Sequence, residues 1–158
     1  MNAQERMERI EKIRALPALA EAAVKGLTGE QLDTRYRDGG WTVRQVVHHL
    51  ADSHMNAFIR MKLILTEENP TLKPYDQDAW AALPDTLAMP VGVSIEILHG
   101  LHDRWCALMG ALPEGAWART AVHPERGKVT LESQLATYSG HGEKHVEQIM
   151  GLRRKNGW

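Results

Sequence analysis

The stretch that decides the fold is residues 41–65, which read WTVRQVVHHLADSHMNAFIRMKLIL. Thr42 follows two glycines and is a good helix N-cap, with Trp41 placed to pack over the first turn. Beyond it, apolar residues recur every three or four positions, which predicts one amphipathic helix from Thr42 to Leu65. Its apolar stripe contains Val43, Val46, Val47, Leu50, Ala57, Phe58 and Met61.

The same periodicity predicts three more long helices, over Ala3–Leu27, Ile95–Ala111 and Leu131–Lys155. Runs of β-branched residues that alternate with polar ones are scarce. The predicted fold class is therefore all-α, a four-helix bundle in which residues 1–158 form one domain. A chain of 158 residues can bury a sufficient core without a disulfide or a metal, so a metal here would serve chemistry more than folding.

Capping residues and one proline set the expected helix boundaries. Ser94 and Thr130 are the predicted N-caps of the last two helices. Pro17 is expected to interrupt the first helix, because a proline does not fit comfortably inside one. Residues 28–32 are predicted to form a short capped turn.

Two long connections join the helices. Residues 66–90 contain four prolines and are expected to form an extended crossover, with one turn around Asp78–Leu83. Such a crossover is a candidate for one wall of a pocket. The segment Arg119–Val129 is predicted to be irregular or hairpin-like.

Charge and composition exclude several classes of partner. The chain has 19 basic and 20 acidic residues without a block of like charge, which argues against binding to nucleic acid or to an anionic membrane. A single cysteine, Cys106, excludes an internal disulfide and a cysteine-rich zinc site. With no apolar core of a signal peptide and no span of about 18 apolar residues, we expect a cytoplasmic protein with a small-molecule partner.

The eight histidines give the first indication of function. His141 and His145 are four residues apart in the last predicted helix, so their side chains lie on one face within reach of a common metal. They fall within or beside the apolar stripe of that helix. The alternative is a pair of hydrogen-bonded core histidines, because two ligands do not make a site.

Candidates for a third ligand lie in the second long helix. His48 and His49 flank its apolar stripe on opposite sides, and periodicity favours His49 only weakly. His54 lies at the centre of the stripe and is expected to be a buried, hydrogen-bonded histidine. His99 and His102 form a competing pair, although their polar neighbours suggest surface pairing.

Other catalytic patterns are missing. In a zincin-type peptidase a glutamate stands beside the first histidine, at the position held here by Gly142, while Glu143 points to a different face. Cys106 has no partner that would mark it as a nucleophile. His123 lies beside a proline and is expected to hold its loop by hydrogen bonds.

Several segments of the sequence resemble those of a known protein family. The segment Tyr36–Asn56, YRDGGWTVRQVVHHLADSHMN, closely resembles the signature of the YfiT group of metal-dependent hydrolases in the DinB-like superfamily. The similarity continues through Lys73–Asp76, Leu101–Trp105, His123–Glu125 and the last histidine pair, so it covers nearly the whole chain. It implies a DinB/YfiT-type four-helix bundle with a long crossover.

The resemblance also implies a metal site. Family members use a histidine directly before a leucine in the second helix and an H-x-x-x-H pair in the last, which correspond here to His49, His141 and His145. Zinc is the default metal and nickel a known occupant. A cytoplasmic homodimer is a further implication. Between the last two ligands, relatives often carry more histidines or aromatic residues than this chain does.

Three neutral imidazoles leave zinc with one open position, suited either to hydrolysis or to binding a thiol as thiolate. The leading hypothesis is a metal-dependent hydrolase of a small molecule. The first alternative, a thiol transferase, is implied by the resemblance, since DinB-like relatives include enzymes that attach a low-molecular-weight thiol such as bacillithiol to electrophiles. The second is a non-catalytic metal- or ligand-binding stress protein. No general acid or base is identified. Candidates to orient the ligands are Gln45, Asp52, Ser53, Tyr138 and Gln148, of which Gln148 is favoured.

Overall fold

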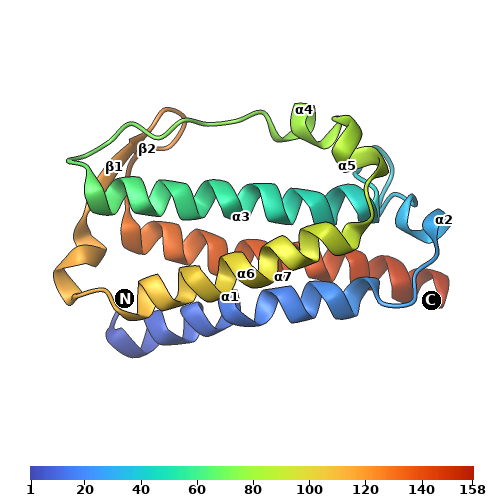
Figure 1. The fold of residues 1–158 in the computed structure, drawn as a ribbon, viewed down its shortest axis with the longest axis horizontal. Coiled ribbons are helices and arrows are strands. Elements are labelled where there is room, and N and C mark those ends of the chain that lie inside the picture. Colours follow the sequence, from blue (N-terminus) through green and yellow to red (C-terminus); the bar gives the residue numbers. More distant parts are fainter.

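Four long helices lie side by side in the computed structural model, which describes all of residues 1–158 (Figure 1). They are α1 (Ala3–Val24), α3 (Val43–Thr66), α6 (Val91–Gly110) and α7 (Leu131–Asn156). The predicted all-α four-helix bundle is confirmed. None of the helices combines the length and the apolar composition that crossing a membrane requires.

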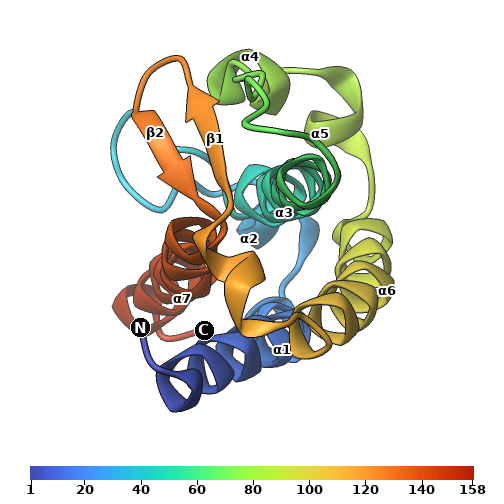
Figure 2. The same ribbon diagram turned by 90° about the vertical axis from the view of Figure 1, so that its left-hand side faces the viewer.

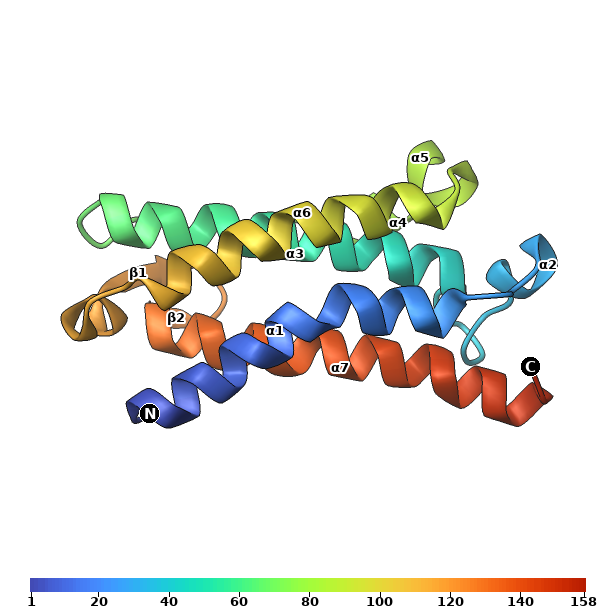
Figure 3. The same cartoon turned by 60° about the horizontal axis from the view of Figure 1, so that its bottom comes forward.

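The order of the helices around the bundle is α1, α6, α3, α7, with each packed on its two neighbours. Helices α1 and α7 run in one direction and α3 and α6 in the other (Figures 1 and 3). Because α3 and α6 are parallel neighbours, the chain between them must return along the length of the bundle. The crossover over residues 67–90 does this, and it contains two short helices, α4 (Gln77–Ala81) and α5 (Pro84–Ala88), where only one turn was predicted.

The helix starts follow their capping residues in two of the three predicted cases. Thr42 and Thr130 each accept the backbone N–H three residues on, as the N-caps of α3 and α7. The same motif at Thr28 starts the short helix α2 (Gly29–Leu32). The prediction of Ser94 as a cap was wrong: α6 begins at Val91 after Pro90, and the Ser94 hydroxyl instead bonds His48 inside the bundle.

Helix α1 differs from its prediction at two points. It ends at Val24 instead of Leu27, and Gly26 takes a positive φ of 77° in the turn that follows. Pro17 does not interrupt it but lies buried within it. A proline has no N–H, so Pro17 leaves the carbonyl of Ile13, four residues earlier, without its usual helical donor. That carbonyl accepts a hydrogen bond from another helix, as described below.

A β-hairpin lies between α6 and α7, which confirms the hairpin-like alternative for Arg119–Val129. After the 3₁₀ helix η1 (Glu114–Ala118), strands β1 (Thr120–His123) and β2 (Gly127–Thr130) pair antiparallel. Val122 also exchanges backbone hydrogen bonds with the crossover, donating to the carbonyl of Pro70 and accepting from the N–H of Leu72. The hairpin and the crossover are thereby tied together above α3 and α7 (Figure 2).

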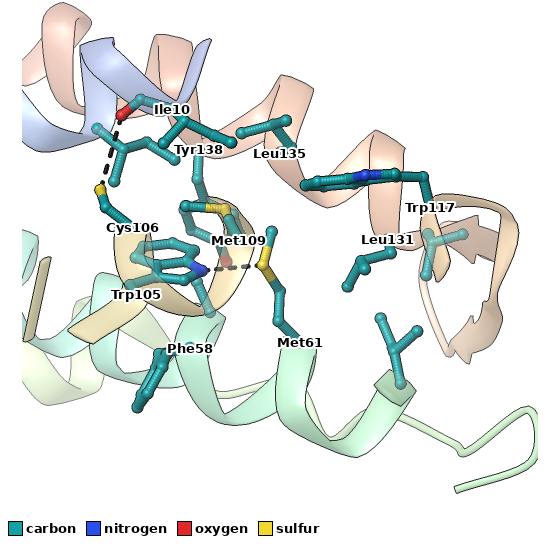
Figure 4. Packing of buried hydrophobic residues seen from close by; sticks show 14 of the residues in the cluster. Ile10, Phe58, Met61, Trp105, Cys106, Met109, Trp117, Leu131, Leu135 and Tyr138 are labelled. Carbon is teal, nitrogen blue, oxygen red and sulfur yellow. Dashed lines mark hydrogen bonds between the residues drawn. The ribbon is translucent and has the colours of Figure 1, made fainter. Parts of the chain in front are cut away.

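Two hydrophobic clusters fill the bundle, one toward each end. The first is built around Trp105, whose indole N–H points at the sulfur of Met61, and it also holds Cys106 (Figure 4). The second contains the beginning of α3 and the end of α7. Between the residues of the two clusters, α3 carries the buried His54 and α6 the buried His102.

Helix α7 packs closely against α1 at Gly142. A Cβ atom placed on Gly142 would lie 2.3 Å from Cδ2 of Leu16, which is fully packed in the core. We expect Gly142→Ala to lower the free energy of unfolding by about 1–3 kcal/mol through overpacking. The matched control is Gly140→Ala on the same helix, where a Cβ meets nothing within 4 Å, and we expect it to stabilise by about 0.5–1 kcal/mol. Urea unfolding of both variants measures the difference, and equal effects would contradict the overpacking.

Candidate metal centre

Three histidines converge where α3 and α7 pack against each other. His49 comes from α3, and His141 and His145 from successive turns of α7. One ring nitrogen of each lies within 4.8 Å of the others, and the Nε2 atoms of His49 and His141 are 3.3 Å apart. The antiparallel packing of the two helices therefore brings together the three residues that the resemblance implied.

The two neighbouring histidines of α3 point in different directions. The ring of His48 points away from the cluster, toward Ser94 and the carbonyl of Met89. The ring of His49 points into the cluster and lies under Trp41, with ring centroids 4.5 Å apart. Trp41 also stacks on His145, at 6.3 Å with an interplanar angle of 14°. The indole thus covers one side of the cluster.

Burial keeps these imidazoles neutral. It lowers the pKa of His49 to about 3 and that of His141 to about 3, and the neighbouring histidines add to the effect. Burial likewise lowers the pKa of His145. Neutral rings present a lone pair on one nitrogen, which is the form that binds a divalent metal.

A chain of hydrogen bonds across the bundle ends on His141. Nδ1 of His102 lies 2.6 Å from the carbonyl of Ile13, Nε2 of His102 lies 3.0 Å from Nδ1 of His54, and Nε2 of His54 lies 3.2 Å from Nδ1 of His141. We call His102, His54 and His141 the histidine relay. It connects α1, α6, α3 and α7.

The Ile13 carbonyl fixes the direction of the relay because it can only accept. Nδ1 of His102 must carry the proton, so its Nε2 accepts from Nδ1 of His54. The same logic makes His54 accept from Nδ1 of His141. His141 is left with its lone pair on Nε2, the atom that faces His49. Pro17 contributes to this arrangement, because its missing N–H leaves the Ile13 carbonyl free for His102.

His145 is oriented in a similar way by a residue on its own helix. Its Nδ1 donates to Oε1 of Gln148 at 2.8 Å, which leaves Nε2 with the lone pair. This is the contact that the sequence favoured. The other orienting candidates do different things: Gln45 caps α3 and bonds the carbonyl of Ala81, and the Tyr138 hydroxyl lies near Arg60. The pKa of Asp52 is raised, first by burial and then by the carboxylate of Asp85.

The surroundings of the remaining histidines agree with the predictions in some cases and differ in others. His54 is buried and hydrogen-bonded as predicted, and His123 accepts a hydrogen bond from the backbone of Glu125 in its loop. The predicted pairing of His99 with His102 at the surface was wrong. His99 is exposed near Glu21, whereas His102 is buried in the relay, and burial lowers its pKa to about 4.

Two cavities meet at the histidine cluster. The first, of about 720 Å³, lies between the crossover, the hairpin, α3 and α7, so the crossover does form a wall. The second, of about 550 Å³, lies between residues 36–41, the start of α4 and α7. Both are lined by His141 and Gln77. The sequence did not reveal two residues of the first cavity, Arg60 and Tyr75.

Comparison with known proteins agrees with this architecture. Residues 12–149 match the sequence profile of the DinB superfamily. A protein of Oceanobacillus iheyensis, provisionally named as a metal-dependent hydrolase, is 48% identical over 151 residues, which cover 96% of this chain and 87% of that protein. A Bacillus mycoides protein with the same provisional name is 48% identical over 149 residues, covering 94% and 86% of the two chains.

A solved structure is similar over the entire chain. YfiT from Bacillus subtilis, described as a probable metal-dependent hydrolase with an unusual four-helix bundle topology, superposes with a TM-score of 0.98 at 45% identity. The match covers 100% of this chain and 91% of YfiT. The chain therefore belongs to the DinB superfamily, as a member of the YfiT type.

Proposed function

We propose that this protein is a metal-dependent hydrolase of a small molecule, with His49, His141 and His145 as the ligands of one zinc ion. The observation that carries the proposal is the convergence of three neutral imidazoles within 4.8 Å. Two nitrogens bound to one tetrahedral zinc stand roughly 3.3 Å apart, given Zn–N distances of about 2.0–2.1 Å. The 3.3 Å between Nε2 of His49 and Nε2 of His141 fits this requirement.

The protein's own side chains prepare the site for such a reaction. A divalent metal with three protein ligands supplies a Lewis acid with an open coordination position. The relay holds the ring of His141 and Gln148 holds the ring of His145 in the required tautomer, and Trp41 restricts access of water from one side. Burial raises the pKa of Tyr75 in the first cavity, so its hydroxyl stays protonated and can donate a hydrogen bond to a substrate.

A chelation experiment tests the hydrolase. Purified protein is offered a panel of small esters and amides before chelation, after chelation, and after zinc or nickel is restored. We expect hydrolysis that disappears with the chelator, returns with metal and is absent from His49→Ala. Metal bound at one equivalent without turnover of any substrate would favour the non-catalytic binder.

A second candidate is a thiol transferase, and the specific observation in its favour is that two cavities share His141. A reaction of two substrates needs two adjoining sites at one centre. With monochlorobimane as the electrophile, the thiol sulfur bonds to carbon, chloride leaves and the thiol proton passes to solvent. Consumption of the bimane that requires protein, metal and thiol together would favour the transferase over the hydrolase.

The relay makes a prediction about metal affinity. In His102→Leu the proton on Nδ1 of His54 loses its buried acceptor, so the rest of the relay is no longer held in one direction. We expect zinc affinity to fall about 10–100-fold, as for other groups that orient metal ligands. Competition with a chromophoric chelator measures it. The control is His48→Leu, which removes another buried, hydrogen-bonded histidine outside the relay, and an equal loss there would contradict the relay's role.

A further inference from the structure

Arg60 is a buried cation without a counter-ion. The residue is 6% exposed on α3, and no aspartate or glutamate lies within 4.0 Å of its guanidinium. Its Nη2 donates to the carbonyl of Lys73 at 2.6 Å, and its Nη1 lies 3.5 Å from the Tyr138 hydroxyl. Its Nε has no partner. A buried unpaired charge is costly, so this arrangement calls for an anion.

Two other arginines, Arg6 and Arg119, provide a comparison with Arg60. Arg6, the only other buried arginine at 5% exposure, is paired with Glu114 and Glu132. Arg119 donates hydrogen bonds only to the carbonyls of Ile64 and Glu67, as Arg60 does to that of Lys73, but Arg119 is exposed to solvent. Arg60 is therefore the exception, buried like Arg6 but without its carboxylates.

Arg60 lines the first cavity, together with His141. Hydroxyl donors of Ser53, Tyr75 and Tyr138 line the same space. Two acidic residues also border it, Asp76 and Glu125, and both are exposed to solvent. The Asp76 carboxylate already has hydrogen-bond partners, because one of its oxygens accepts two backbone N–H groups at the start of α4. Neither acid neutralises Arg60.

Only one residue separates Arg60 from the histidine cluster. The Tyr138 hydroxyl contacts Arg60, and the Tyr138 ring lies 5.7 Å from the ring of His141. On the hairpin side, burial, followed by Arg126 and Arg60, lowers the pKa of His123. Arg60 and Arg126 thus lie near His123, in the cavity that His141 also lines.

We propose that the first cavity binds a small organic anion, whose carboxylate or phosphoryl group pairs with Arg60 while its reactive part reaches the histidine cluster. The proposal rests on the proposed function, since it names the substrate class of that site. A guanidinium suits both kinds of oxyanion because its N–H groups can bond two oxygens at once. The rest of the substrate extends from Arg60 past Tyr138 to His141.

Calorimetric titration of the zinc-loaded protein with succinate and, separately, with inorganic phosphate tests the anion site. Succinamide serves as the neutral counterpart of succinate. We expect succinate or phosphate to bind and succinamide not to. Binding should weaken roughly tenfold or more in Arg60→Met and by less in Arg60→Lys, which keeps the charge but loses the planar fork. Arg119→Met, which loses two carbonyl contacts outside the cavity, should bind as wild type does.

The outcome distinguishes the anion site from the metal centre. Binding that is unchanged in Arg60→Met but abolished in His141→Ala/His145→Ala would place the anion on the metal and overturn the proposal. So would the absence of any binding, whatever the metal content found by elemental analysis. Binding that depends on Arg60 and persists in the double histidine variant would support the anion site even if the metal centre failed. Circular dichroism of Arg60→Met and Arg60→Lys shows whether each variant is folded.

Discussion

The double variant His141→Ala/His145→Ala is expected to lose its bound metal entirely while keeping the helical circular dichroism of the wild type. One ligand, His49, remains after the substitution, and a single imidazole does not hold zinc against solvent. The bundle should stay folded because two hydrophobic clusters, neither of which contains a histidine, hold the four helices together. Elemental analysis should find one equivalent of metal in the wild type and none in the variant.

The matched control is His99→Ala. His99 is the exposed histidine of the bundle, and its side chain contacts only Glu21, at 3.4 Å. We expect this variant to retain one equivalent of metal. A full equivalent in the double variant would place the metal elsewhere. Unfolding of the double variant would show that the cluster stabilises the fold and that our assignment of its role to chemistry is wrong.

The fold was predictable because its signals are local. Thr42 and Gln45 form a capping box, and the apolar positions after them follow the helical period, so α3 could be placed from its own residues. Pro17 was misjudged because its effect depends on a distant partner. The carbonyl that it frees at Ile13 bonds His102 of α6, a contact that no local pattern reveals.

The candidate site was predictable in part. Helical spacing alone placed His141 beside His145, whereas the choice of His49 over His48 needed the family resemblance. His102 was misassigned because Asp103 and Arg104 follow it, yet adjacent residues point to other faces of a helix. The burial of His102 is better indicated by the residues three or four positions away, which share its face of the helix. These are Leu98, Trp105 and Cys106, and all three are buried. Arg60 carries a similar signal, since it shares a face with Ala57 and Ile64.

Acid is expected to unfold the metal-free protein between about pH 6 and pH 4. The pKa of His49, His141 and His102 falls from 6.5 to about 3, about 3 and about 4, with burial as the main cause. Below pH 6.5 the unfolded chain takes up protons at these residues that the folded chain does not. Stability is therefore complete above pH 6.5 and is lost progressively as the pH falls toward the folded pKa values.

The size of this loss of stability follows from the number of histidines whose pKa is lowered by folding. Between its folded and unfolded pKa values, each of these histidines lowers the free energy of unfolding by about 1.4 kcal/mol for each pH unit of acidification. The three together therefore lower it by about 4 kcal/mol per pH unit near pH 5. The free energy of unfolding of such a domain is about 5–15 kcal/mol, and two pH units remove about 8 kcal/mol, which is more than the low end and about half of the high end of that range. Urea unfolding in the presence of chelator at pH 7, 6 and 5 measures the slope. His99→Ala should leave this slope unchanged, because that side chain is exposed.

A total change in the free energy of unfolding below about 1 kcal/mol from pH 7 to pH 5 would mean that the buried histidines accept protons in the folded state. The neutral, lone-pair-bearing cluster on which metal binding depends would then not exist at those pH values.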